Sequence, residues 1–165
     1  MVDDPNDLTI RERADVQNLA PACVTDEKAP GSKTSGEALM GNGELILIVD
    51  DEESVLRVTK MILENKGYRI ITAHDGPGGL AMFGREVNAI SVVLTDISLP
   101  LMDGLALIRS LKKIKPSVHF IASTGESQDA YAQELQKLGV TNLLIKPYDT
   151  QKLLETLRQA LPPSN

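Results

Sequence analysis

The sequence contains one cysteine, no tryptophan and only two histidines among its 165 residues. A single cysteine excludes a disulfide within the chain, and Cys23 with His74 and His119 offers too few ligands for a zinc site. The longest strictly aliphatic run, Leu45 to Val49, has five residues. A membrane span needs roughly 20 apolar residues and a signal-peptide core about 7 to 15. We therefore expect a cytoplasmic protein that does not enter a membrane.

The chain also lacks any run of basic residues. Its 23 acidic and 17 basic side chains give a net charge of -6. This charge repels phosphate backbones and anionic lipids. We therefore exclude nucleic acid and membrane surfaces as non-specific partners.

The first 43 residues differ in composition from the rest of the chain. They carry 8 acidic and 4 basic side chains, three prolines and no sustained apolar period. Such a segment buries too little apolar surface to offset the conformational entropy that folding removes. We predict a disordered leader over residues 1–43, a folded domain over 44–161 and a short tail over 162–165.

Short apolar runs recur through the folded part and alternate with longer segments of helical spacing. The runs are 45–49, 68–73, 91–94, 118–122 and 143–145. Two of them, 45–49 and 91–94, contain stretches that do not alternate apolar with polar residues, which is typical of parallel strands covered on both faces. The pattern predicts five βα units, and so an α/β fold with a parallel sheet.

The first helix has a clear apolar stripe and a clear end. We expect it to begin at about Glu53, to bury Val55, Val58 and Ile62, and to end at a left-handed Gly67.

The later helices carry more varied signals. Glycines crowd the second helical segment, where each interior glycine costs roughly 1 kcal/mol against alanine, and we assign residues 76–79 to a loop. The fourth helix is expected to begin near Ser127 and to end at Gly139, and the fifth to be capped by Asp149 or Thr150.

Polar side chains follow four of the five predicted strands within two residues. They are Asp50 and Asp51, Asp96, Thr124, and Lys146. The carboxyl ends of parallel strands share one edge of a sheet, and ligands bind outside that edge. We therefore expect these side chains to meet in a single pocket.

Three carboxylates in one pocket require a cation. Unit charges about 4 Å apart repel by about 4 kcal/mol at an effective dielectric constant of 20. Oxygen ligands that leave room for water and a phosphoryl group suit Mg²⁺, and Lys146 can supply a second positive charge. Asp96 ends the central strand, which favours it as the nucleophile that forms an acyl phosphate, and Thr124 can turn its hydroxyl toward that group.

Each of these residues has a simpler explanation when it is taken alone. The acidic residues from Asp50 can cap the helix that follows, Asp96 and Thr124 can be turn residues, and Lys146 can be a solvated surface lysine. Capping preferences do not readily explain why four strands each end in a chemically complementary polar group. The complete set therefore favours a functional site.

These motifs, in this order, resemble the receiver domain of two-component response regulators. The resemblance rests on Leu45 to Glu52, on Asp96 before Ser98, Pro100, Asp103 and Gly104, on Thr124-Gly125, and on Lys146-Pro147-Tyr148. It covers residues 44–161. It implies a flavodoxin-like (βα)₅ fold with strand order 2-1-3-4-5, and transfer of a phosphoryl group from the phosphohistidine of a kinase.

The resemblance also implies a role for each motif residue. Asp96 would be the phosphoacceptor, and Mg²⁺ would be held by Asp50, Asp51, Asp96 and the backbone carbonyl of Ser98. Thr124 and Lys146 would contact the phosphoryl oxygens, and the Lys146-Pro147 peptide bond would be cis.

The chain departs from the family pattern at one position, and at a second position two residues are candidates for the same role. Leu143 stands where the family usually has an aromatic switch residue, three positions before the lysine, so the resemblance implies no output coupled to an aromatic residue at that position. Ser123 precedes Thr124 and is the alternative for the sensing hydroxyl.

We interpret the chain as a phosphoacceptor switch without an output domain. It would catalyse transfer of a phosphoryl group from a donor to its own Asp96, and it would not be an enzyme with turnover. Its expected partners are a histidine kinase or histidine phosphotransfer protein and a downstream effector. An alternative is the receiver portion of a hybrid histidine kinase. A Mg²⁺-dependent phosphohydrolase of the haloacid-dehalogenase type is remote, because it needs Asp-x-Asp where this chain has adjacent Asp50 and Asp51. A docking module that is never phosphorylated is disfavoured by the full set of acids, hydroxyl and lysine.

Overall fold

The computed structural model describes residues 40–127 and 130–161. The ten elements are β1 (Leu45–Val49), α1 (Glu53–Asn65), β2 (Arg69–Ala73), α2 (Gly76–Arg85), β3 (Ile90–Asp96), α3 (Gly104–Ile114), β4 (His119–Thr124), α4 (Ala132–Lys137), β5 (Asn142–Ile145) and α5 (Thr150–Ala160). All strand pairs are parallel and the sheet order is β2-β1-β3-β4-β5, the flavodoxin-like order that was expected. The predicted tail and most of the predicted leader lie outside the described residues. Within the described ranges, no helix is long and apolar enough to cross a membrane.

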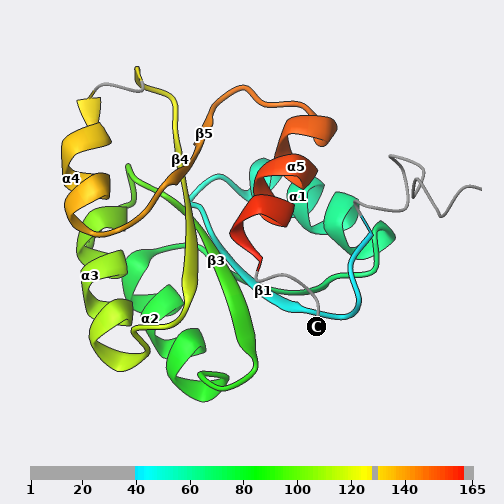
Figure 1. Cartoon of the computed structure of the whole chain (residues 1–165), viewed down its shortest axis with the longest axis horizontal. Helices are drawn as coiled ribbons and strands as arrows, with labels where there is room; N and C mark the ends of the chain where they lie inside the picture. Colours follow the sequence, from blue (N-terminus) through cyan, green and yellow to red (C-terminus); the bar gives the residue numbers. More distant parts are fainter. Residues whose placement is uncertain (1–39, 128–129, 162–165) are drawn as a thin grey trace, which may run out of the picture. The chain divides into compact units, whose positions relative to one another are not determined.

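The sheet lies between two layers of helices, with α2, α3 and α4 on one face and α1 and α5 on the other (Figure 1). Successive residues of β1 point to opposite faces. Leu47 belongs to the core beside α2, α3 and α4, whereas Ile46 and Ile48 belong to the core beside α1 and α5. Both faces of the central strands are thus covered, which explains their unbroken apolar runs.

Helix α1 has the predicted bounds, but of the predicted stripe Val55, Val58 and Ile62 only Ile62 packs, partly buried, against the core. Leu56, Thr59 and Leu63 face the sheet, whereas Val58 is 47% exposed. The predicted and observed stripes are one residue apart and share the same helical spacing. Spacing alone therefore does not decide which of two adjacent stripes is buried.

Helix α2 begins at Gly76, so the assignment of residues 76–79 to a loop was wrong. The Asp75 side chain accepts a hydrogen bond from the Gly78 N–H at 2.6 Å and caps the helix. A Cβ on Gly79 would lie 2.9 Å from Val49, so this glycine lets the helix approach β1 closely. Close packing and a cap offset the low helix propensity of glycine here.

The same capping device begins two other helices. The side chain of Asp103 accepts the N–H of Ala106 at 2.7 Å and that of Asp149 accepts the N–H of Lys152 at 2.7 Å. Asp149 is thus the cap of α5, one of the two candidates expected from the sequence.

Helix α4 is shorter than predicted. It begins at Ala132 instead of near Ser127, and residues 128–129 lie outside the described ranges. It ends before Gly139, whose φ of 63° is the left-handed conformation expected there.

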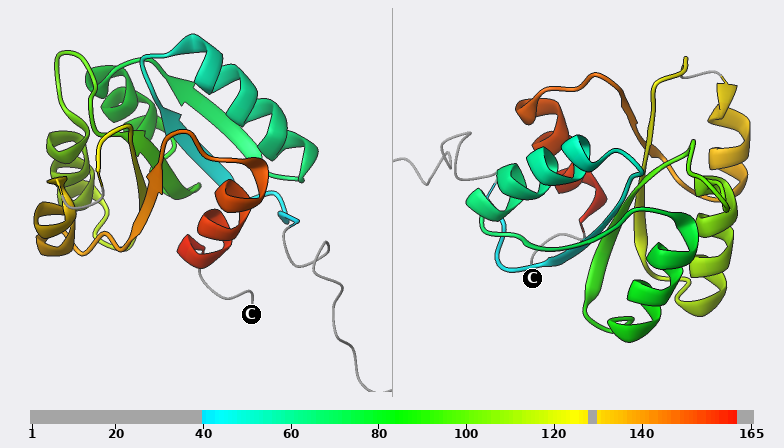
Figure 2. Two further views of the ribbon diagram at one scale, coloured as in Figure 1. Left: turned by 90° about the horizontal axis from the view of Figure 1, so that it is seen from above. Right: turned by 180° about the vertical axis from the view of Figure 1, so that it is seen from behind.

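Residues 41–43 run along the turn between α1 and β2, at the amino-terminal edge of the sheet (Figure 2). The N–H of Gly41 donates to the Lys66 carbonyl at 2.7 Å, and the N–H of Gly43 donates to the Gly67 carbonyl at 3.0 Å. A Cβ on Gly41 would lie 2.6 Å from the ring of Tyr68, so the chain approaches this ring closely. These backbone hydrogen bonds therefore fix residues 41–43 to the domain.

Candidate functional site

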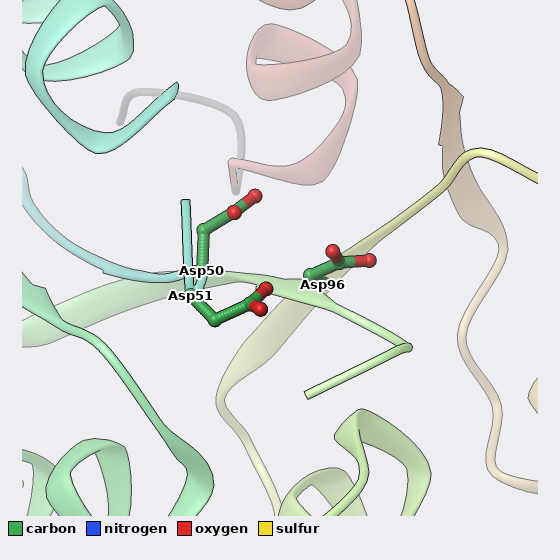
Figure 3. A group of neighbouring side chains, drawn as sticks. All are labelled: Asp50, Asp51 and Asp96. Atoms are coloured by element: carbon green, nitrogen blue, oxygen red, sulfur yellow. The ribbon is translucent and has the colours of Figure 1, made fainter. Parts of the chain in front are cut away.

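Three carboxylates meet at the carboxyl-terminal edge of the sheet (Figure 3). Asp50 and Asp51 directly follow β1, and Asp96 ends the neighbouring strand β3. One oxygen of each side chain lies within 4.8 Å of the others. Asp50 and Asp96 are 2% and 7% exposed, and Asp51 is exposed. The fold thus gathers the acidic residues that the sequence singled out.

Lys146 binds two of these carboxylates at once. Its Nζ lies 2.7 Å from Oδ2 of Asp50 and 2.9 Å from Oδ2 of Asp96. Lys146 follows β5, and its backbone N–H donates to the Thr124 carbonyl at 2.7 Å. The peptide bond to Pro147 is cis, as the resemblance implied. The lysine therefore faces the acidic pocket.

Burial and charge act against each other in this pocket. Burial raises the pKa of the Asp50 carboxyl, although the hydrogen bond from Lys146 opposes the shift. Burial lowers the pKa of Lys146, but its hydrogen bonds to Asp50 and Asp96 outweigh burial and raise the pKa. The lysine consequently stays a cation at neutral pH.

The backbone holds the acidic side chains in place. The N–H of Glu52 donates to Oδ1 of Asp50 at 3.0 Å, and the N–H of Ser98 donates to Oδ1 of Asp96 at 3.3 Å. The loop after Asp96 closes where the Gly104 N–H donates to the Ile97 carbonyl at 2.9 Å. Asp96, the acceptor candidate, is thus fixed by a hydrogen bond from its own loop and by one from Lys146, which follows β5.

Both candidate sensing hydroxyls are buried. Oγ1 of Thr124 accepts the N–H of Glu126 at 3.0 Å. Ser123 is the β4 residue that pairs directly with Asp96, and its hydroxyl donates to the Thr95 carbonyl at 3.5 Å. Thr124 therefore ends β4 beside the pocket with its hydroxyl engaged by its own loop.

An aromatic residue does lie near the pocket, but it comes from α4 and not from β5. Leu143 is partly buried against the core beside α2, α3 and α4. Tyr131, the N-cap residue of α4, packs against the same core. The Glu126 carboxylate raises the pKa of its hydroxyl, which also interacts with Ser98. No motif in the sequence marks Tyr131 as a neighbour of this pocket.

Sequence reasoning also missed an apolar groove beside Lys146. Val55 and Val58 of α1 line it together with Pro147 and Tyr148. Val58 is available to line this groove because α1 buries Leu56 and leaves Val58 exposed. The apolar character of Val58 was visible in the sequence, but its exposure was not.

Residues 46–158 match the model of the response regulator receiver domain. The chain is 34% identical over 116 residues to the transcriptional regulatory protein ZraR of Salmonella typhimurium, covering 70% of this chain and 26% of that protein. It is 30% identical over 154 residues to the sensor kinase CckA of Brucella abortus, covering 93% of this chain and 15% of that protein. The chain thus spans only about a quarter or less of these relatives.

Solved structures share the fold. A response regulator receiver domain protein from Clostridium thermocellum has a TM-score of 0.67 and 34% identity, over 70% of this chain and 92% of that one. The chemotaxis protein CheY4 of Vibrio cholerae has a TM-score of 0.68 and 27% identity, over 72% of this chain and 99% of that one. The chain therefore belongs to the response regulator receiver domains, the phosphoacceptor signalling domains of two-component systems.

Proposed function

We propose that Asp96 accepts a phosphoryl group from the phosphohistidine of a histidine kinase or histidine phosphotransfer protein. The observation that carries this proposal is Lys146, which lies within hydrogen-bond distance of both Asp50 and Asp96 while Asp51 completes the cluster. This arrangement holds a carboxylate at the edge of the sheet, with its charge partly neutralised.

In the proposed transfer, a carboxylate oxygen of Asp96 attacks phosphorus. The new O–P bond forms as the P–N bond to the donor imidazole breaks, and the electron pair of that bond returns to the nitrogen. Charge on the transferring oxygens must be neutralised as they move, and positioning supplies most of the rate. Lys146, just after β5, is placed to neutralise this charge, and the hydroxyl of Thr124 can donate a hydrogen bond to a phosphoryl oxygen.

The pocket has the composition of a Mg²⁺ site. Three carboxylates and one ammonium leave two negative charges, which matches a divalent cation, and every candidate ligand is a hard oxygen. Asp50, Asp51, Asp96 and the backbone carbonyl of Ser98 would hold the ion. When bound, Mg²⁺ supplies positive charge that balances the carboxylates and the phosphoryl oxygens.

The phosphorylated domain would signal by contact with an effector protein or by passing the phosphoryl group onward. In this proposal the receiver spans residues 44–161 and is a phosphoacceptor, not an enzyme with turnover. The N–H of Glu126 donates to Thr124, and α4 is the next helix along the chain, so a change at the pocket can reach the surface formed by α4 and β5.

A second candidate is the receiver portion of a hybrid histidine kinase. The match to CckA favours it, because this alignment covers 93% of the chain and extends beyond the receiver fold. In such a protein the donor histidine would belong to the same polypeptide.

Incubation with acetyl phosphate and Mg²⁺ tests the acceptor. We expect the intact mass to increase by one phosphate that is lost at alkaline pH, and we expect Asp96→Asn to gain none. Asp149→Asn is the matched control, because asparagine can still cap α5 and the charge change is the same. Phosphate uptake by Asp96→Asn, or none by the wild type, would contradict the proposal.

A further inference from the structure

The loop between Asp96 and α3 contains a strained turn at Leu101. The N–H of Met102 donates to the Pro100 carbonyl at 2.7 Å, which closes a three-residue turn around Leu101. The φ of Leu101 is 66°. Turns of this kind with a positive central φ are rare and strained, and a leucine has no local polar group that favours this conformation. Within residues 40–127 and 130–161, no other non-glycine residue has a positive φ.

The packing around the turn imposes this conformation. Ile97 and Leu99 are buried in the core beside α2, α3 and α4, and Met102 packs against it. A Cβ on Gly76 would lie 2.6 Å from Met102, so α2 and the loop are in close contact. Because the loop is anchored on both sides of Leu101, the packing restricts the backbone φ and ψ angles at position 101.

The Leu101 side chain itself does not take part in this packing. It is 87% exposed, whereas the next most exposed large apolar residue of the described ranges, Met61, is 56% exposed. Glycine would adopt the same backbone without strain and would expose no apolar surface. Folding therefore gives no reason for a leucine at this position, and strain of this kind concentrates where residues act on ligands or partners.

We propose that Leu101 is an apolar contact for the histidine-bearing protein that delivers the phosphoryl group to Asp96, an inference that rests on the proposed function. The donor must reach a carboxylate that is 7% exposed at the edge of the sheet. Leu101 lies on the loop that begins at this carboxylate and closes back onto its backbone at Gly104. A protein surface that covers Asp96 must therefore meet the rim on which Leu101 stands.

Four substitutions distinguish the effect of the Leu101 side chain from the effect of backbone strain at this position. Leu101→Gly and Leu101→Asn remove the apolar group and tolerate a left-handed backbone. Leu101→Met keeps an apolar group of similar size. Ile114→Ala is the matched control, because Ile114 is another exposed apolar residue but lies at the far end of α3 from the pocket.

Two phosphodonors distinguish an effect on docking of the donor protein from an effect on the phosphorylation reaction itself. The first is acetyl phosphate, which needs no protein surface. The second is the set of purified, phosphorylated histidine kinases and histidine phosphotransfer proteins of the organism that encodes the chain. The donor that transfers fastest to the wild type is then used with every variant.

We expect kcat/KM for the protein donor to fall by about tenfold in Leu101→Gly and Leu101→Asn, the effect of losing one good interface contact. Leu101→Met and Ile114→Ala should transfer like the wild type, and all four should react with acetyl phosphate at the wild-type rate. Unchanged protein transfer to Leu101→Gly overturns the inference, as does an equal loss with acetyl phosphate. If no histidine protein donates to a wild type that acetyl phosphate does phosphorylate, the proposed donor class fails, and the inference fails with it.

Discussion

The Cα of Gly104 lies so close to the backbone of Asp96 that a Cβ built on it would be 2.1 Å from the Asp96 carbonyl oxygen. The contact is with backbone, which cannot turn aside as a flexible side chain can. The first residue of α3 is thus packed directly against the acceptor candidate.

Gly104→Ala is therefore expected to lower the free energy of unfolding by about 1 to 3 kcal/mol, the usual cost of overpacking. It should also slow phosphorylation by acetyl phosphate, because the Asp96 backbone must move. Urea denaturation and intact mass measure the two effects. Gly84→Ala is the control, since a Cβ there meets nothing within 4 Å and should stabilise α2 by up to about 1 kcal/mol. Similar effects of the two substitutions would contradict the argument.

Lys146→Met should slow phosphorylation of Asp96 by about a hundredfold, the loss typical when one charge-stabilising donor is removed. The substitution also leaves Asp50 and Asp96 without their shared ammonium, so the metal-free protein should be less stable. Lys113→Met removes an exposed lysine from α3 and should change neither property. A wild-type phosphorylation rate in Lys146→Met would remove this lysine from the proposed mechanism.

Mg²⁺ should raise the melting temperature of the wild type, because an ion that binds only the folded state stabilises it by mass action. Asp51→Asn should abolish most of this increase. Without Mg²⁺ the same variant should be more stable than the wild type, since it loses repulsion from Asp50 and Asp96. Glu64→Gln, an exposed change on α1, should respond to Mg²⁺ like the wild type. Calorimetric scans at several Mg²⁺ concentrations distinguish these outcomes.

Leu101→Gly should increase the free energy of unfolding by up to about 1 kcal/mol. A left-handed leucine costs roughly 1–2 kcal/mol, and the greater freedom of glycine in the unfolded chain offsets part of the gain. Urea denaturation measures the change. A less stable Leu101→Gly protein would mean that the leucine side chain contributes to folding.

The strands and the acidic pocket could be predicted because their signals are local. An unbroken run such as Leu45 to Val49 identifies a strand buried on both faces, and the residue after it must lie at the sheet edge. Asp50, Asp96 and Lys146 were therefore assigned to one edge from the sequence, and the fold brings them together.

The features that could not be predicted depend on packing between elements. The buried stripe of α1 differs from the expected one by a rotation of one residue, and sequence spacing does not fix that rotation. The glycines at 76–79 were assigned to a loop because glycine has a low helix propensity, and the sequence does not show that Gly79 packs against Val49 and Gly76 against Met102. The positive φ of Leu101 is imposed by a loop closed on both sides, and leucine itself gives no such signal.

The hydrogen bonds of Gly41 and Gly43 to the turn between α1 and β2 have a practical consequence for labelling the protein. These bonds anchor residues 41–43 at the edge where the strands begin, and α5, which packs against the sheet, ends at Ala160 after starting from the opposite edge. Five-residue strands separate the two edges by about 16 Å. A fluorophore or surface tether attached at residue 41 or at residue 161 therefore joins the domain at the edge away from Asp96, which suits measurements of phosphotransfer on an immobilised sample.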